Sequence, residues 1–531
     1  MNILITPDIL EWAIGNLTRG ITKAKCMQRF NFYTVPVHPR GTQEAFLSLD
    51  DAVKKGIDFW HAMYWHSAEN VLNDLPMLKL KDVPTLLTHH NHYALDKKDW
   101  RVNFDGITIA TRWGYDKLKT MHDSVYQIPY GLDLDRYSFI KEYPPEGDVV
   151  GYVGRVLPHK NLKIICEVAK ELKYKVIGSG YVEDQDYWRS FPHDNLEYKG
   201  NIGRLAMSPS NIKDDIYKKM KVFVMYSTGE KETGTLPLLE AMARGVPVMA
   251  TSQGMARDLI EDGKNGIIFT EENFKEKLKM FMEDEKLRMQ CRKHAWETIK
   301  NYSEERMAWN YGKAYYDVMW KRMPVVSVIV PTCHRHEKLI DNILSIEGNN
   351  YQAKEIIVID DGLDDMTKKT VMELKKRIKT PLLYLHTGKH EGNEYNLARA
   401  RNMGVCEAMG SVLLFLDDRL TLGKLSLEHI AEVPAGEWHH GRKITKEGIS
   451  TKRQFIENFS WIRKRDFVAG GMFNERMMMY GGMSELTREQ YRTKVNFIYD
   501  EKAEVNENVR ASGKRRGDIS KAKDIIYKLY S

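Results

Sequence analysis

Two glutamates, Glu232 and Glu240, stand on either side of the point where a loop passes into a predicted helix. The helix is expected over residues 237–244, because Pro237 suits a first helical position and Gly245 suits an exit. The free N–H groups at such a helix start can bind phosphate. The two carboxylates can accept paired hydrogen bonds from the hydroxyls of a sugar and a ribose. Together these features predict a site for a nucleotide-sugar.

Two pairs of aspartates in the second half of the chain follow apolar stretches. Asp360 and Asp361 come after one stretch, and Asp417 and Asp418 come after another. Short apolar stretches that end in polar residues are typical of the buried strands of a parallel sheet. Carboxylates accept hydrogen bonds from a base or a ribose, and their oxygens are ligands that hard divalent cations prefer.

The residues from Glu232 to Glu240 resemble the Glu-x7-Glu motif of retaining glycosyltransferases of the GT-B type, family 4. Residues 154–161, Gly-Arg-Val-Leu-Pro-His-Lys-Asn, are similar to the Gly-Arg…Lys-Asn element of that family. The resemblance implies a nucleotide-sugar donor, a catalytic role for Glu232 and a donor-binding role for Glu240. It also implies that Arg155 and Lys160 clamp the diphosphate, and these two cations can neutralise a leaving nucleoside diphosphate without a metal.

Three histidines in four residues stand at 89–92. Related enzymes place a histidine near this strand end against the donor sugar, so the resemblance implies a catalytic contact for His90. A metal bound by these histidines is the alternative, but adjacent side chains on a turn diverge and no carboxylate is placed to complete a site. Gly15 and Asn16 follow the first apolar stretch, where the family has a donor loop; a simple turn is the other interpretation.

The elements that must position these residues alternate between strand and helix from the start of the chain, which predicts parallel sheets wound with helices. We expect an α/β protein with two Rossmann-like parallel sheets, one in residues 1–130 and one in residues 131–322. The linker near Tyr130 resembles that of the family, with Tyr130 in place of the usual Asn. An aromatic-rich helix over 303–322 resembles the helix that crosses back to the first domain, and its aromatic side chains are expected in the core.

The pattern restarts after residue 323, where a strand followed by Pro-Thr-Cys-His-Arg and a second strand ending in Asp-Asp-Gly resemble the inverting GT-A glycosyltransferases of family 2. This resemblance implies a GT-A nucleotide-binding α/β domain over 324–500. Asp361, with Asp360 beside it, would bind the base or ribose. Arg401, in a segment similar to the family's Ala-Arg-Asn-x-Gly helix, would meet the diphosphate.

The Asp-x-Asp motif of that family corresponds here to Asp417, Asp418 and Arg419. The resemblance implies Mn²⁺ or Mg²⁺ at Asp417 and Asp418, and the alternative is that Arg419 replaces part of the charge of the metal. An inverting transfer needs a carboxylate base. Glu485, with Glu489 behind it, is the expected base, although the Glu-Asp pair of the family is not intact and an exposed helix residue is the alternative.

Composition is compatible with several domains and restricts the partners. The chain has 531 residues, 42% of them hydrophobic, a formal charge of +7 and five scattered cysteines, which predicts neither a disulfide framework nor a short-spaced metal motif. The absence of a membrane-spanning apolar run and of a basic leader indicates a cytoplasmic protein. A polar tail over 501–531 carries one basic cluster at 514–516, which leaves peripheral membrane contact open.

We therefore expect a bifunctional enzyme that transfers sugars to a glycan, a lipid-linked acceptor or a protein-linked acceptor, with retention in the first half and inversion in the second. One alternative is a single activity in the first half with a degenerate sugar-binding module in the second. The other is a nucleic-acid base as the acceptor, which the interspersed acidic residues disfavour.

Overall fold

The computed structural model describes residues 1–8, 13–36, 48–64, 83–90, 104–137, 139–201, 215–229, 232–321, 323, 325–388, 396–423, 426–445, 448–450, 455–476 and 483–507. The chain divides into two compact units. The first unit consists of Asn2–Met27 and Phe32–Val318, and the second consists of Met1, Gln28–Asn31 and Met319–Ser531.

The first unit contains two sheets whose order and direction match the expectation of two Rossmann-like halves. The strands of the first sheet follow the order β2-β1-β3-β4-β5-β6, and β1, β3, β4, β5 and β6 pair in parallel. Their bounds are β1 Asn2–Thr6, β2 Asn31–Thr34, β3 Phe59–Ala62, β4 Thr85–His89, β5 Gly106–Ile109 and β6 Val125–Gln127. The helical segments of this part are α1 Ala13–Lys23, η1 Lys25–Arg29, α2 Leu49–Val53 and α4 Arg112–Leu118.

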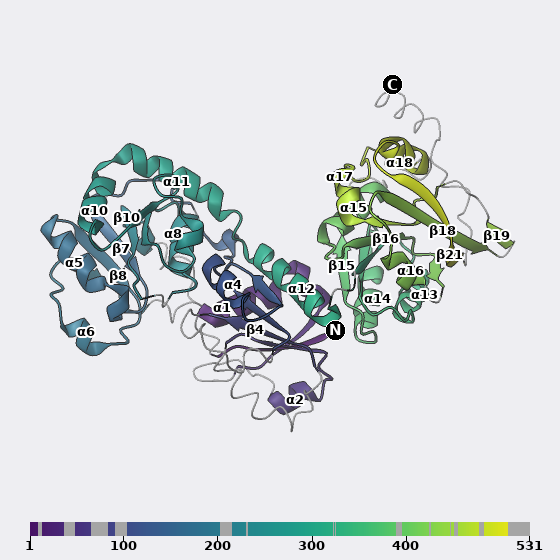
Figure 1. The fold of residues 1–531 in the computed structure, drawn as a ribbon, viewed down its shortest axis with the longest axis horizontal. Coiled ribbons are helices and arrows are strands. Elements are labelled where there is room, and N and C mark those ends of the chain that lie inside the picture. Colours follow the sequence, from purple (N-terminus) through teal and green to yellow (C-terminus); the bar gives the residue numbers. More distant parts are fainter. Residues whose placement is uncertain are drawn as a thin grey trace. The chain divides into compact units, whose positions relative to one another are not determined.

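The second sheet of the first unit has the order β12-β11-β10-β7-β8-β9 and is parallel throughout. Helices lie on both of its sides (Figure 1). Its strands are β7 Val149–Val153, β8 Lys175–Ser179, β9 Leu196–Tyr198, β10 Val222–Met225, β11 Val248–Thr251 and β12 Ile267–Phe269. Its helical segments are η3 Leu134–Arg136, η4 Pro158–Lys160, α5 Leu162–Glu171, α6 Gln185–Arg189, α8 Leu236–Arg244, α9 Ala256–Leu259, α10 Phe274–Glu283 and α11 Glu285–Ile299.

Helix α8 forms where the sequence predicts it. Pro237 lies in its first turn, and Gly245 ends it with a φ of 73°, the left-handed conformation that glycine adopts without strain. The helix joins β10 to β11, two adjacent parallel strands, so its N-terminus lies at the carboxyl edge of the sheet.

Helix α12, Glu304–Trp320, crosses back to the first sheet as expected. The hydroxyl of Tyr315 lies 2.8 Å from Nδ1 of His61 in β3, and that of Tyr311 lies 3.3 Å from the hydroxyl of Thr88 in β4. Both tyrosines are buried, which confirms that these aromatic side chains belong to the core.

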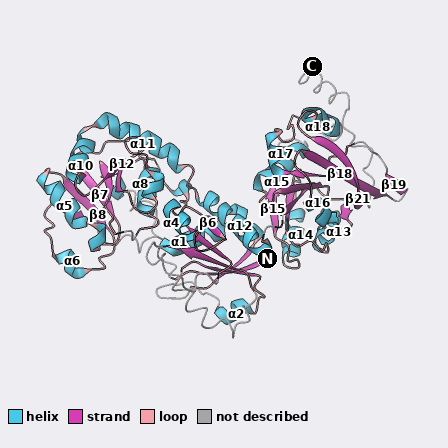
Figure 2. Ribbon diagram, in the orientation of Figure 1, coloured by secondary structure: helices cyan, strands magenta, loops and turns pink. Residues whose placement is uncertain are grey.

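The second unit is built on a mixed sheet of order β15-β14-β13-β16-β20-β18-β21-β17, with β19 paired to β18. Strands β13 to β16 are parallel, and β20 is antiparallel to both β16 and β18. Figure 2 shows the strands of each sheet in magenta and the helices in cyan. The strands are β13 Val326–Thr332, β14 Lys354–Asp360, β15 Leu382–His386, β16 Val412–Leu416, β17 Leu420–Leu422, β18 Glu437–Thr445, β19 Gly448–Ser450, β20 Phe459–Arg463 and β21 Asn496–Glu507. The helices are α13 His336–Glu347, α14 Met366–Lys375, α15 Leu397–Glu407, α16 Ser426–Ala431, α17 Lys464–Ala469 and α18 Met483–Tyr491.

Two expectations are corrected by the elements. Strand β21 continues to Glu507, so residues 501–507 belong to the sheet and not to the polar tail; Ala503 and Val505 are buried in it. Gly15 and Asn16 lie inside α1 and not in a donor loop. The basic cluster at 514–516 falls outside the described residues.

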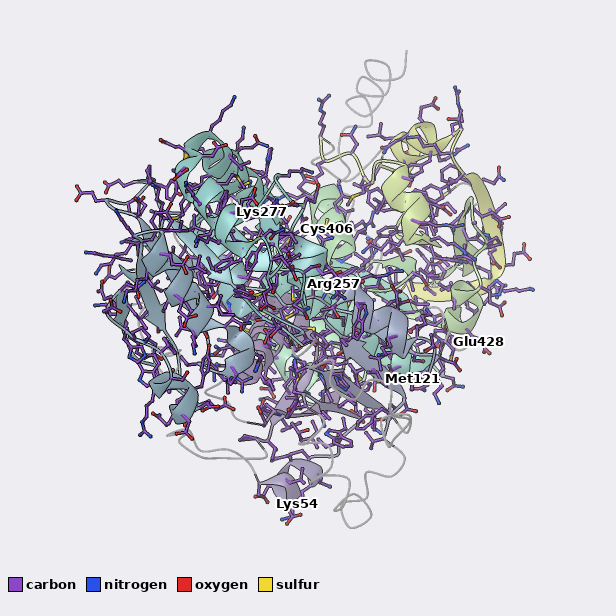
Figure 3. All side chains as sticks on the ribbon, turned by 60° about the vertical axis from the view of Figure 1, so that its left-hand side comes forward. Lys54, Met121, Arg257, Lys277, Cys406 and Glu428 are labelled. Carbon is purple, nitrogen blue, oxygen red and sulfur yellow. The ribbon has the colours of Figure 1, made fainter. Side chains whose placement is uncertain are left out.

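All five cysteines are free, and Cys406 on α15 is exposed (Figure 3). Among the described residues, no helix is long and apolar enough to cross a membrane.

Candidate functional site

The first candidate site lies in the loop that leads into α8. Glu232, at the end of this loop, is buried, and its carboxylate forms an ion pair with Lys160 of η4. The side chains of Lys160 and Glu232 are 15% and 10% exposed, so the pair is shielded from water. The structure therefore brings together a predicted diphosphate ligand and the predicted catalytic carboxylate.

Glu240 occupies a more closed position than the sequence suggests. Its Oε2 accepts a hydrogen bond of 3.0 Å from Tyr217, and its Oε1 accepts one of 3.4 Å from Tyr137. Burial, followed by the nearby Glu240 charge, raises the pKa of both phenols. The guanidinium of Arg244 stacks over both phenol rings at 4.4 and 4.7 Å. For Glu240 to bind a ribose as expected, the ribose hydroxyls would have to share its carboxylate with the two phenol hydroxyls or displace them.

Arg155 stands apart from this buried pair. It forms an ion pair of 2.9 Å with Glu183, and both side chains are about half exposed. An exposed ion pair of this kind is weak and easily exchanged, so Arg155 can turn toward a diphosphate at little cost.

His90 follows β4 directly and connects the two sheets of the first unit. Its Nδ1 lies 2.5 Å from the hydroxyl of Tyr130, and its carbonyl accepts a hydrogen bond from Thr233, next to Glu232. Burial lowers the pKa of His90 to about 4, so the imidazole is neutral at neutral pH. Of the other two histidines of the cluster, His89 is buried at the end of β4, and His92 lies outside the described residues.

Tyr130, which stands where the family that the sequence resembles has Asn, packs against the loop before α8. A Cβ atom added to Gly234 would lie 1.6 Å from the Tyr130 ring. The ring therefore occupies the space that any side chain at 234 would need, and it brings the linker against the loop that carries Glu232.

The second candidate site lies at the carboxyl edge of β14, β13 and β16. Asp360 is fully buried; its Oδ1 accepts from the N–H of Gly362 at 2.9 Å and its Oδ2 from the hydroxyl of Tyr384 at 2.9 Å. Asp361 accepts from the hydroxyl of Thr387, and its Oδ2 accepts from a backbone N–H at 2.9 Å. Asp360 therefore holds the turn after β14, and of the two aspartates it is Asp361 that is partly exposed.

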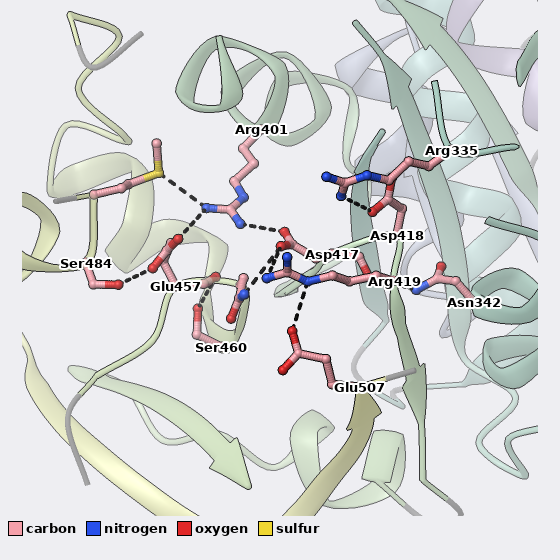
Figure 4. A network of polar contacts seen from close by, with 12 residues as sticks. Arg335, Asn342, Arg401, Asp417, Asp418, Arg419, Glu457, Ser460, Ser484 and Glu507 are labelled. Carbon is pink, nitrogen blue, oxygen red and sulfur yellow. Dashed lines mark hydrogen bonds and ion pairs between the residues drawn. The ribbon is translucent and has the colours of Figure 1, made fainter. Parts of the chain in front are cut away.

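The predicted metal ligands Asp417 and Asp418 are buried and are paired with arginines (Figure 4). Arg401 Nη2 lies 3.0 Å from Asp417 Oδ1, Arg419 Nη2 lies 3.6 Å from Asp417 Oδ2, and Arg335 Nη1 lies 3.1 Å from Asp418 Oδ1. Burial, together with the charge of Asp417, raises the pKa of Asp418 to about 6, although Arg335 opposes this.

The prediction that Arg401 meets a diphosphate is not supported by these contacts. The Arg401 side chain has no exposed area, and besides Asp417 it lies 3.8 Å from the carboxylate of Glu457. The two carboxylates, which come from different parts of the sequence, hold the guanidinium of Arg401 in place between them.

Glu457 is a residue that sequence reasoning missed. It accepts a hydrogen bond from Ser484, whereas the predicted base Glu485 is exposed at the start of α18. A second missed carboxylate, Glu507 at the end of β21, lies 3.1 Å from Nε of Arg419. No motif marks either residue, because each reaches the cluster only through the fold: Glu457 lies in the turn before β20 and Glu507 ends β21.

The metal expected at Asp417 and Asp418 does not fit the residues around them. Each carboxylate already accepts from arginine, and within the described parts of the chain no group of three His, Cys, Asp or Glu side chains could hold a metal ion.

Comparison with known proteins agrees with this division of the chain. Residues 134–298 match the family model "Glycosyl transferases group 1", and residues 327–433 match "Glycosyl transferase family 2". The chain carries two glycosyltransferase domains in tandem. The first unit contains the group 1 domain, and the second contains the family 2 domain.

Individual relatives resemble parts of this tandem glycosyltransferase. A GalNAc(5)-diNAcBac-PP-undecaprenol beta-1,3-glucosyltransferase of Campylobacter jejuni is 33% identical over 152 residues, 28% of this chain and 48% of that protein. A GDP-mannose-dependent alpha-mannosyltransferase of Corynebacterium glutamicum is 26% identical over 212 residues, 37% of this chain and 48% of that protein. The chain thus spans about half the length of these two curated relatives.

One solved structure, HepE of Anabaena in complex with UDP and glucose, covers 59% of this chain and 99% of its own. Its TM-score is 0.48 at 14% identity, a similarity too distant to carry a conclusion.

Proposed function

We propose that the chain transfers sugars from nucleotide-sugar donors to a glycan or glycoconjugate acceptor. The observation that carries this proposal is the buried pair of Lys160 and Glu232 beside the N-terminus of α8. A nucleotide-sugar can bind to both members of this ion pair: its anionic diphosphate can bind Lys160, and its sugar hydroxyls can donate hydrogen bonds to Glu232.

The group 1 domain would use these residues without a metal. Lys160, the N-terminus of α8 and an incoming Arg155 would stabilise the charge that develops on the leaving diphosphate. Glu232 would accept hydrogen bonds from the donor sugar, and neutral His90 would contact the same sugar from the first sheet. The resemblance to family 4 makes retention of the anomeric configuration the expected outcome.

The family 2 domain would perform a second transfer with inversion, which makes the enzyme bifunctional. The support is the position of Asp361 and Asp418 at one edge of the sheet: β13 lies between β14 and β16, and Thr332 of β13 donates a hydrogen bond of 2.8 Å to Asp418. Glu485 is the proposed base, because its exposure on α18 leaves it accessible to an acceptor hydroxyl.

The acceptor is proposed as a class only. The name of the Campylobacter jejuni relative specifies an undecaprenol-linked glycan, which supports a lipid-linked acceptor and peripheral contact with a membrane. Glycans on protein are the other candidate.

A second candidate function has one specific observation in its favour. The arginines at Asp417 and Asp418 neutralise the carboxylates that a metal-assisted transfer would use. In this case the group 1 domain is the only transferase, and the family 2 domain holds the acceptor.

The test measures release of nucleoside diphosphate from a panel of nucleotide-sugars by the full-length chain. Glu232→Gln would inactivate the group 1 site, and Asp361→Asn would weaken the family 2 site. Glu171→Gln and Glu373→Gln are matched controls, because each removes an exposed carboxylate paired with lysine in the same unit.

Loss of release from different donors in Glu232→Gln and Asp361→Asn supports two activities. Loss in Glu232→Gln alone supports the single-activity candidate. If Glu232→Gln releases diphosphate as fast as Glu171→Gln from every donor, the role proposed for the buried pair is wrong.

A further inference from the structure

The surroundings of Asp417 and Asp418 supply hydrogen-bond donors to all four carboxylate oxygens. On Asp417, Oδ1 faces Arg401, while Oδ2 faces Arg419 and also Nδ2 of Asn458 at 3.3 Å. On Asp418, Oδ1 faces Arg335 and Oδ2 accepts from the hydroxyl of Thr332. A metal ion would therefore have to displace donors that are already in place.

The charges of the described residues in this cluster balance. Two further carboxylates take part, since Glu457 lies near Arg401 and Glu507 lies near Arg419. A fourth basic residue is Lys443 of β18: burial lowers the pKa of its ammonium, and the charges of Glu507, Asp417 and Glu457 oppose this. The acidic members are Asp417, Asp418, Glu457 and Glu507, and the basic members are Arg335, Arg401, Arg419 and Lys443.

A cluster whose charges balance attracts a divalent cation only weakly. Sites for Mn²⁺ or Mg²⁺ present oxygens with an excess of negative charge, and here each carboxylate is compensated by a neighbouring cation. Arg401 has no exposed area and Arg419 is 12% exposed, so neither can leave its carboxylate for water without rearrangement of the fold. An added ion would also meet fixed guanidinium charges in a poorly screened interior.

We propose that the family 2 domain of this chain is a metal-free site, in which Arg401 and Arg419 occupy the electrostatic role that a divalent cation has beside an Asp-x-Asp motif. Arg419 is the decisive residue, because it stands at the position where the motif has its second acid and it contacts Asp417 and Glu507 together. This inference concerns the binding of cations and does not depend on whether the domain transfers a sugar.

The proposal is tested by titrating the full-length chain with Mn²⁺ alone and measuring free Mn²⁺ by electron paramagnetic resonance. Arg419→Asp restores an acid at the third position and changes the cluster from neutral to an excess of negative charge. The matched control is Arg492→Asp, because Arg492 is 72% exposed, pairs with Glu489 on the surface and lies in the same unit.

We expect Arg419→Asp to bind Mn²⁺ at least about tenfold more tightly than the parent and Arg492→Asp, since it replaces a repelling charge by an attracting one. Binding by the parent that disappears in Asp417→Asn or in the double variant Asp417→Asn/Asp418→Asn would overturn the proposal. Binding by the parent that survives the double variant lies elsewhere in the chain and agrees with it.

If circular dichroism shows that Arg419→Asp does not fold, the same titration is carried out with Arg335→Gln. Arg335 is 29% exposed, so its removal is better tolerated and releases Oδ1 of Asp418. Tighter Mn²⁺ binding by Arg335→Gln supports the proposal. A folded variant at either position that binds no more tightly than Arg492→Asp contradicts it, because the arginines would then not be what keeps the ion out.

Discussion

At the scale of single residues, burial decides whether the His90 imidazole is neutral or carries a second proton. Because burial lowers its pKa to about 4, His90 stays neutral across the range in which most transferases work. It can then position a sugar hydroxyl, and the Tyr130 hydroxyl at Nδ1 determines the orientation of the ring.

Tyr130→Phe removes this hydrogen bond and leaves the ring in place. We expect the transfer rate of the group 1 domain to fall by up to about fivefold, which corresponds to one neutral hydrogen bond of about 1 kcal/mol. The pH profile between 5 and 8 should keep its shape, because His90 does not titrate there. Steady-state kinetics over this range provide the measurement.

Tyr126→Phe is the control for that change. It also removes a tyrosine hydroxyl contact, the 2.5 Å hydrogen bond to Asp317 of α12, but this contact is exposed. An equal loss of rate in both variants would show that Tyr130 acts through stability and not through His90.

At the scale of elements, the linker and the loop before α8 share one small volume. The Tyr130 ring lies where a side chain at 234 would stand. Gly234→Ala should therefore destabilise the first unit by about 1–3 kcal/mol, the usual cost of overpacking. Tyr130→Asn makes room, so the double variant should recover much of this loss.

Chemical denaturation of the two single variants and of the double variant gives the coupling free energy directly. Strict additivity would mean that Gly234 and Tyr130 do not compete for space. The same experiment tests whether the departure from the usual Asn at 130 is matched to a glycine in the loop.

The protonation of Glu304, the first residue of α12, is coupled to folding. Burial, with a contribution from Asp133, raises the pKa of Glu304 to about 7, and its carboxyl packs against Gly20 of α1. The folded chain thus retains a proton that the unfolded chain releases near pH ~4.3, so the free energy of unfolding should decrease as pH rises from about 4.3 to 7.

Glu304→Gln should remove this decrease, because an amide does not titrate. The measurement is urea unfolding at several pH values, followed by a signal from the first unit. Glu285→Gln is the matched control, since Glu285 is the first residue of α11 and is exposed. A slope that Glu304→Gln leaves unchanged would locate the titrating group elsewhere.

At the scale of the whole molecule, the proposed pair of activities on one chain would raise the effective concentration of an intermediate glycan. A mixture of two full-length variants, Glu232→Gln and Asp361→Asn, contains both active sites on separate chains. We expect this mixture to form the final glycan more slowly than the parent at equal concentration of active sites. Product analysis during the reaction gives the measurement, and equal rates would contradict a benefit of the tandem arrangement.

The sequence by itself determined the parallel strands, the helix with Pro237 and Gly245 at its ends, and the aromatic helix that returns to the first sheet. These features depend on local rules: apolar runs form buried strands, proline opens helices and glycine closes them. The Glu-x7-Glu and Asp-Asp motifs likewise located both candidate sites, because functional residues follow strand ends in α/β folds.

Only the tertiary structure decided how these residues are partnered. Glu457 and Glu507 pair with the arginines beside Asp417, and Lys443 interacts with Asp417, although all three are distant from it in the sequence. Tyr217, which precedes β10, likewise donates to Glu240 of α8, which follows it. Such contacts are long-range and follow no spacing rule, whereas the charge of a buried group depends on all its neighbours together. The motif therefore predicts where the acidic residues lie, and the packing around them decides whether a cation or an arginine compensates their charge.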